Sequence, residues 1–133
     1  MARVTGIGGV FFKAQDPAAL GAWYKEHLGL DVQPWGGVAF RWRDDRPDTG
    51  YTVWGPFAAD TDYFDPSSKP YVLNFRVDDL DGLLQQLRDA GVTIVGGPED
   101  HDQGRFAWIL DPEGTKLELW QPDPNDPALT EDR

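Results

Sequence analysis

Apolar residues recur every three or four positions in two stretches of the chain, and both stretches predict an amphipathic helix. The first stripe is Leu20, Trp23, Tyr24, His27 and Leu28, and the second is Leu80, Leu83, Leu84 and Leu87. The expected capping residues are Asp16 and Pro17 before the first helix, Asp78 or Asp79 before the second, and Gly29 and Gly91 after them.

Each predicted helix belongs to a longer pattern that occurs twice, in residues 8–32 and 71–95: strand, Asp-containing cap, helix, Gly stop and strand. Short segments rich in Val, Ile and aromatic residues follow, and "DPEG" at 111–114 predicts a tight hairpin turn. The segment "TVWGP" (52–56) matches "ELWQP" (118–122). The repeat therefore predicts an α+β fold of two βαβββ modules, with roughly eight strands and both helices on one side.

The expected organisation is a single domain over residues 1–133. Module one covers 4–57, a polar linker covers 58–70, module two covers 71–122 and an acidic tail covers 123–133. Because the helices take one face of the sheet, the other face is expected to curve around a pocket.

The stretch "KLELWQP", residues 116–122, alternates as a strand with one buried face does. Leu117 and Leu119 share one face, while Lys116, Glu118 and Trp120 share the other. Two interpretations of Glu118 follow: either the polar face of the strand is exposed to solvent, or the carboxylate lies in a pocket.

Composition narrows the classes of protein. The 133 residues include no Cys, which excludes disulfides, thiolate metal sites and a Cys nucleophile. Asp and Glu number 23 against 12 Lys and Arg, and the net charge of −11 argues against nucleic-acid binding. No membrane-length apolar run and no signal-peptide pattern is present, so we expect a cytoplasmic protein that does not engage membranes. Six Trp, four Tyr and seven Phe are many for this size, and we expect some to line a pocket.

Three stretches give the sequence a family resemblance: "KAQDPAALGAWYKEHLGL", "NFRVDDLDGLLQQLRDAGV" and "GRFAWILDPEGTKLELWQP". Their order and spacing resemble the vicinal oxygen chelate superfamily of glyoxalases, bleomycin-resistance proteins and extradiol dioxygenases, over nearly the whole chain. The resemblance implies paired βαβββ modules, a curved mixed sheet around a pocket and often a homodimer. In metal-using members it implies a divalent ion held by His, Gln or Glu from the first and last strands of each module.

Carried over to this chain, the four ligand positions of the family fall on Gly9, Thr52, Val72 and Glu118, and only Glu118 has a ligating side chain. One carboxylate would leave a metal mostly hydrated, so we expect no cofactor, with a divalent metal as the alternative. His101 is read as an exposed loop imidazole or, alternatively, a substitute ligand. His27 is read as a packed helix residue.

On this register, the expected ligand-binding residues are Phe11, Thr52, Trp54, Asn74, Arg76 and Trp120, while Phe40 and Trp42 share one face of the third strand. The rings either line a site for a flat organic molecule or fill the concave sheet. We hypothesise that Arg76 and Asn74 reach Glu118, so that an organic ion pair replaces the metal. Glu118 is also the candidate catalytic residue, as a general base, although an adjacent cation would weaken that role.

Three functions compete. The first is a metal-independent protein of the bleomycin-resistance kind, which binds an aromatic or cationic small molecule within one chain or at a homodimer seam. The second is a metal-dependent lyase, isomerase or dioxygenase resembling glyoxalase, with Glu118 as one ligand. The third, a structural module, leaves Asn74, Arg76 and Glu118 without a role. We rank them in this order, since fold alone does not fix function.

Overall fold

The structure is a computed structural model that describes residues 2–3, 5, 7–45 and 50–129. Its elements are α1 (Pro17–Leu28), η1 (Trp42–Asp44), β1 (Leu73–Arg76), α2 (Leu80–Asp89), β2 (Ile94–His101), β3 (Gly104–Leu110), β4 (Lys116–Pro122) and η2 (Pro127–Leu129). Within these residues, no helix has the length and apolar character that crossing a bilayer requires.

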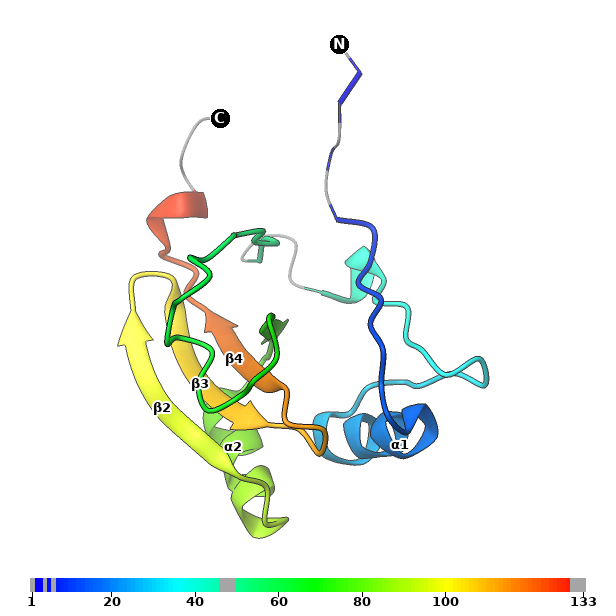
Figure 1. Cartoon of the computed structure of the whole chain (residues 1–133). Coiled ribbons are helices and arrows are strands. Elements are labelled where there is room, and N and C mark those ends of the chain that lie inside the picture. The colour runs from blue at the N-terminus through cyan, green and yellow to red at the C-terminus, as the bar shows by residue number, and fades with distance from the viewer. Residues whose placement is uncertain (1, 4, 6, 46–49, 130–133) are drawn as a thin grey trace.

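The four strands form one mixed sheet in the order β1-β4-β3-β2. Figure 1 labels β4, β3 and β2 side by side. β4 pairs in parallel with β1 and antiparallel with β3, and β3 pairs antiparallel with β2. The strand that carries Glu118 therefore lies inside the sheet, with a hydrogen-bonded neighbour on each side.

One face of the sheet carries the hydrophobic core. Leu117 and Leu119 of β4 are fully buried there, as the alternation in "KLELWQP" predicts. The core cluster also contains Leu20, Tyr24, Leu80, Leu84, Leu87, Ala107 and Ile109. Each fully buried Leu contributes about 1.5–3 kcal/mol by leaving water. This packing fixes the parity of β4, so Lys116, Glu118 and Trp120 must occupy the opposite face.

The predicted caps at Asp16, Asp79 and Gly29 are confirmed, whereas the C-cap of α2 is Ala90, one residue before the predicted Gly91. Asp16 accepts a hydrogen bond from the Ala19 amide at 3.1 Å, and Asp79 accepts one from the Gly82 amide at 3.1 Å. Both bonds satisfy amides that a helix start leaves without an intrahelical partner. Of the two candidates at the second helix, the cap is Asp79. α1 ends at Gly29, whose φ of 71° suits a residue without a Cβ.

The "DPEG" turn joins β3 to β4 and also holds α1. The Tyr24 hydroxyl donates to Asp111 at 2.8 Å in the core. Burial and this bond raise the pKa of Tyr24 well above its ordinary value. Glu113 accepts hydrogen bonds from the backbone amides of Gln15 and Asp16, at 2.7 and 3.0 Å, and these bonds lower the pKa of its carboxyl. The turn therefore ties the first predicted module to the second.

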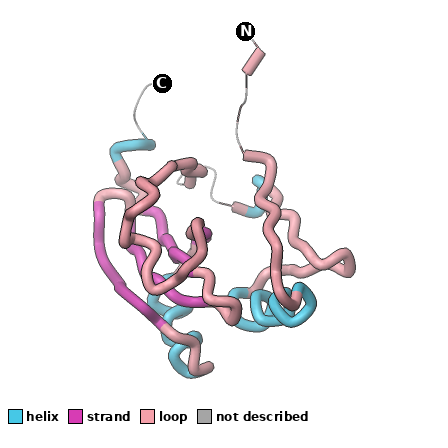
Figure 2. The backbone as a smooth tube through the Cα atoms, in the orientation of Figure 1, coloured by secondary structure: helices cyan, strands magenta, loops and turns pink. Residues whose placement is uncertain are grey.

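The repeat is only partly realised. Module two has its complete β1-α2-β2-β3-β4 unit, whereas the described residues of module one contain its helix but no strand (Figure 2). The prediction of roughly eight strands is therefore not met in this part of the chain, where four are formed. A short strand is stable only when a neighbour pairs with it and covers one face. The module-one segments lack that cover, since Phe11, Phe40 and Trp54 are 93%, 66% and 78% exposed.

The segment between the modules, residues 58–70, lies on the sheet face away from α2 and is drawn green in Figure 1. The Tyr63 hydroxyl of this segment bonds Glu118 of β4, and the Tyr63 carbonyl accepts a bond from Lys116. The polar face of β4 is therefore partly covered by chain rather than open to water.

Candidate functional site

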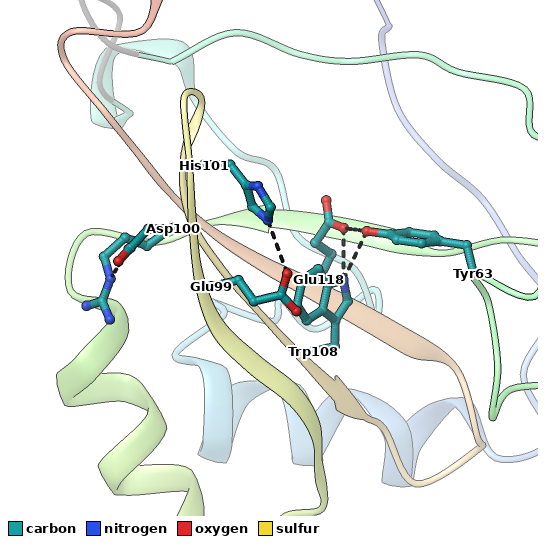
Figure 3. Close-up of polar contacts among 7 residues, drawn as sticks. Tyr63, Glu99, Asp100, His101, Trp108 and Glu118 are labelled. Atoms are coloured by element: carbon teal, nitrogen blue, oxygen red, sulfur yellow. Dashed lines mark hydrogen bonds and ion pairs between the residues drawn. The ribbon is translucent and has the colours of Figure 1, made fainter.

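A cavity of about 570 Å³ lies on the sheet face opposite the helices. Its walls come from β2, β3, the turn between them, β4 and the 58–70 segment: Tyr63, Val95, Gly96, Glu99, His101, Gln103, Phe106, Trp108, Lys116 and Glu118. The volume falls in the range of small-molecule sites, about 300–1,000 Å³. Figure 3 shows several of these side chains, namely Tyr63, Glu99, His101, Trp108 and Glu118.

Glu118 is the centre of a hydrogen-bond network. Its Oε2 accepts bonds from the Tyr63 hydroxyl and from Nε1 of Trp108, the latter at 2.9 Å (Figure 3). Its Oε1 accepts one from Nδ2 of Asn74 at 2.7 Å. Strand pairing explains two of the partners, because Asn74 on β1 and Trp108 on β3 both stand directly opposite Glu118. All three donors are neutral. They satisfy a half-buried carboxylate without an ion pair.

Tyr63 closes the network from outside the sheet. Its hydroxyl also lies 3.2 Å from Trp108 Nε1, and its ring meets that of Trp108 edge-on at 6.4 Å. Burial, and then the hydrogen bond to Glu118, raise the pKa of Tyr63 well above its ordinary value, so the phenol stays protonated at neutral pH. Tyr63 is therefore a fixed donor to Glu118.

Phe106 and Trp108 form an aromatic wall of the cavity, and the buried Trp120 continues their ring stack without lining the cavity. The Phe106 ring stacks between Trp108 and Trp120, with centroids 6.4 and 6.0 Å apart and interplanar angles of 15° and 3°. Trp120 is 3% exposed, and its Nε1 donates to the Gln103 carbonyl at 2.9 Å. Hydrogen bonds orient the indoles at both ends of this ring stack.

The other polar groups lie at two places in the cavity. His101 and Glu99, at the end of β2, are half-exposed and approach each other at 3.2 Å. Lys116 is 9% exposed and lies at the start of β4, with its Nζ 4.8 Å from the Tyr63 ring centroid.

A divalent metal does not fit this set of groups. Of the family's ligand positions only Glu118 carries a ligating side chain, and three donors already occupy its two oxygens. The indole N–H of Trp108 can donate but cannot coordinate a metal. In the described part of the chain, no group of three or more His, Asp or Glu side chains is placed to hold an ion.

The predicted partners of Glu118 are half confirmed. Asn74 reaches it, but the predicted Arg76–Glu118 ion pair is wrong. Arg76 instead pairs with Asp45, with Nε at 2.9 Å from Oδ2, and donates to the Tyr51 carbonyl. Strand register explains the difference, because Arg76 lies opposite Trp120 and two residues beyond Asn74.

The other predicted site residues divide in the same way. Glu118 lines the cavity, whereas Trp120 is buried, stacks on Phe106 and does not line it. Phe11 and Trp54 are strongly exposed, Thr52 is exposed, and none of the three lines the cavity. Gly9 does not line it either, so the expected shared register between the modules does not bring their pocket residues together here. A ligand-binding role for Phe11, Thr52 and Trp54 stays a prediction.

The two histidines agree with the predictions of a packed His27 and an exposed His101, but the surroundings of His101 differ from the prediction. His27 is half-buried on α1, with its ring 5.2 Å from that of Trp23. His101 is exposed, as expected, but it ends a strand rather than lying in a loop, and it lines the cavity.

Several cavity residues were missed, and only some had a signal in the sequence. In "GRFAWIL", Phe106 and Trp108 alternate with Ala107 and Ile109, so strand parity and the "DPEG" turn could have placed Trp108 opposite Glu118. Tyr63 had no periodic signal, because it lies in a polar segment between the two repeats.

Comparisons with known proteins agree with this fold. A family model described as a glyoxalase-like domain matches residues 9–120. No curated protein gives a significant match.

Solved structures are similar over most of the chain. TnmS3, an antibiotic binding protein from Streptomyces sp. CB03234, has a TM-score of 0.59 at 24% identity, over 92% of this chain and 100% of that one. A glyoxalase/bleomycin resistance protein from the same organism has a TM-score of 0.50 at 26% identity, over 80% and 92%. The integron cassette protein VCH_CASS1 from V. cholerae has a TM-score of 0.58 at 19% identity, over 91% and 98%. Other similarities are partial: one covers 40% of this chain and 47% of a conserved domain protein.

Proposed function

Because the chain belongs to the family of glyoxalase-like domains, we propose that it is a small-molecule-binding protein whose ligand is an aromatic compound held beside Glu118. The observation that carries the proposal is the cavity of about 570 Å³, which joins an ordered aromatic wall to a fixed polar network. Ligand sites usually combine apolar walls with a few placed polar groups.

An aromatic ligand suits the walls of this cavity. Phe106 and Trp108 line it, and offset or edge-on ring pairs contribute about 0.5–1.5 kcal/mol beyond their buried area. The predicted alternative, a cationic ligand, has less support, because neutral donors already satisfy Glu118 and Lys116 would repel a cation. We therefore propose an aromatic ligand in preference to a cationic one.

Similarity to TnmS3 supports binding rather than a reaction. That protein is described as antibiotic binding, and its likeness here concerns the fold. The network also argues against the enzymatic alternatives. A carboxylate offers about four acceptor positions, and three bonds already reach Glu118. Glu118 is thus poorly placed both as a metal ligand and as a general base.

Indole NMR spectra test the proposal. The chain has six Trp, and each gives one Nε1–H signal in a ¹⁵N-correlated spectrum. A panel of small aromatic compounds should include some that shift the Trp108 signal and raise the unfolding midpoint, as binding to the native state requires. Trp108→Leu should abolish the midpoint shift. Trp35→Leu, which removes an indole that is 70% exposed and outside the cavity, should leave it unchanged. A panel that moves neither signal nor midpoint would refute the proposal.

The proposal includes a cytoplasmic homodimer. In the part of the chain that the structure describes, the large apolar side chains that are exposed lie between residues 7 and 57: Ile7, Val10, Phe11, Phe12, Trp35, Phe40, Trp42, Val53, Trp54 and Phe57. Exposed apolar surface of this extent marks an interaction surface. A second copy is the occupant that the repeat favours, because it supplies segments with the same strand pattern. Light scattering should give twice the 14.9 kDa chain mass, and Phe11→Ser with Trp54→Ser should restore the monomer mass.

A further inference from the structure

Lys116 is a buried cation that pairs with no carboxylate of the described residues. The residue is 9% exposed and lines the cavity. Its Nζ donates to the Tyr63 carbonyl and lies 4.8 and 5.8 Å from the ring centroids of Tyr63 and Trp108. No ion pair joins it to an acid among the residues that the structure describes.

Glu118 does not neutralise this cation, although it lies two residues further along the same strand face. The oxygens of Glu118 accept from Tyr63, Trp108 and Asn74. The positive ends of these three dipoles point at the carboxylate and reduce its field toward the cavity. A buried ammonium that lacks an anion costs free energy, so its place in the wall calls for an explanation.

The surroundings of Lys116 leave part of its hydrogen-bonding capacity unused. An ammonium has three N–H donors, and a single described oxygen, the Tyr63 carbonyl, accepts from it. The two rings that flank it attract a cation through their faces. They hold Nζ in place but do not supply a counter-charge. The aromatic wall and the ammonium thus border the same cavity.

We propose that Lys116 is the anchor for an acidic oxygen of the ligand, and that the ligand class is aromatic acids, carrying a carboxylate or phenolate on a planar ring system. This inference rests on the proposed function, since it assumes that the cavity binds an aromatic compound. The ring lies against Phe106 and Trp108, and the oxygen accepts from the ammonium. Ligand binding then supplies the missing anion at a position where screening by salt is weak.

Three probes of one shape test the inference by calorimetric titration at pH 7: 2-naphthoate, 2-naphthamide and 2-naphthylmethylammonium. Naphthoate should bind the full chain about ten- to a hundredfold more tightly than naphthamide, the gain typical of hydrogen bonds to a charged group. The ammonium compound should bind most weakly. Lys116→Met should remove most of the preference for naphthoate and change the naphthamide affinity less than about threefold, because the ring wall is intact.

Matched variants keep the test decisive. Lys116→Arg retains the charge and should retain the preference for naphthoate. Lys13→Met, at an exposed lysine outside the cavity, should bind all three probes as the unmodified protein does. Near-ultraviolet circular dichroism of each variant checks that the fold is kept.

The outcomes separate the two proposals. Equal affinity for naphthoate and naphthamide, or unchanged naphthoate binding in Lys116→Met, would overturn the role of Lys116 and leave the proposed function standing. Tightest binding of the ammonium compound would reverse the charge preference and overturn it as well. Absence of binding by all three probes would overturn the inference together with the aromatic-ligand proposal.

Discussion

The hydroxyl of Tyr24 donates a 2.8 Å hydrogen bond to Asp111, across 87 residues of sequence and inside the core. Asp111 also accepts from the amides of Glu113 and Thr115, both at 2.9 Å, so one carboxylate organises the turn and receives the helix. α1 is held to the second module by this bond as well as by apolar contact.

Removing that hydroxyl should destabilise the whole domain. Tyr24→Phe keeps the ring but deletes a buried donor to a charged acceptor, and we expect a loss of about 1.5–3 kcal/mol in the free energy of unfolding. Urea unfolding measures the loss. Tyr71→Phe is the matched control, since no hydrogen bond of the Tyr71 hydroxyl is formed within the described residues, and it should change stability by less than about 0.5 kcal/mol. Equal effects of the two variants would contradict a special role for the Tyr24–Asp111 bond.

The hydrogen bonds that the Glu113 carboxylate accepts should make the stability of the fold depend on pH. Backbone amides of Gln15 and Asp16 lower the pKa of Glu113 below its ordinary 4.5. A carboxyl with a lowered pKa binds its proton less readily when folded, so its contribution is present above pH 4.5 and is lost as pH falls through the folded value. Glu113→Gln should therefore be less stable than the unmodified protein at pH 7, with the difference shrinking toward pH 3. Asp60→Asn, at an exposed carboxylate, should show no such trend. A Glu113→Gln difference that stays constant across this pH range would contradict a stabilising role for the hydrogen bonds that Glu113 accepts.

Tyr63 and Glu118 should be energetically coupled. A double-mutant cycle with Tyr63→Phe and Glu118→Gln should give a coupling of about 1–2 kcal/mol in urea unfolding, because the two groups share one bond. The parallel cycle with Arg76→Leu and Glu118→Gln should be additive within about 0.5 kcal/mol, since Arg76 pairs with Asp45 instead. Coupling in the second cycle and not in the first would restore the sequence-based ion pair.

Gly97 of β2 should not tolerate a side chain. Its φ is 82°, and an added Cβ would lie 2.6 Å from the Phe106 carbonyl oxygen and 2.8 Å from the Ala107 Cα. Both contacts are to the backbone of β3, which cannot move away without breaking the sheet. Gly97→Ala should cost at least about 1–3 kcal/mol of unfolding free energy. Gly8→Ala, at an open position, should cost little by the same measurement, and a Gly97→Ala protein of unchanged stability would show that β2 packs differently.

Much of module two could be predicted because apolar residues recur at regular intervals along its helix and strands. The leucine stripe of α2 and the alternation of β4 both follow from burying one face, and side-chain parity alone placed Asn74 on the same sheet face as Glu118. The caps at Asp16 and Asp79 were readable because a helix start needs a local acceptor.

The wrong or missing predictions concern side-chain contacts that the spacing of apolar residues does not predict. Parity gives the face on which Arg76 lies but not which acid it meets, and Asp45 arrives from a loop. Tyr63 lies in a segment whose polar composition suggests a linker, and only the folded chain brings it to Glu118. In module one, apolar alternation predicted strands that the described residues do not form. Their pairing depends on cover that the described chain does not supply.

The central position of β4 has a consequence for how the protein is made. β4 is the last of the four strands to leave the ribosome, yet it separates β1 from β3, and Asn74 must wait for a partner 44 residues later. Until then the β2–β3 hairpin and β1 cannot join, and Ala107 and Ile109 lack the neighbours that bury them. Pairing between residues distant in sequence is slow because the intervening chain must be ordered first. The cavity therefore forms only after β4 has been synthesised. A nascent chain arrested before residue 116 exposes apolar surface that chaperones recognise.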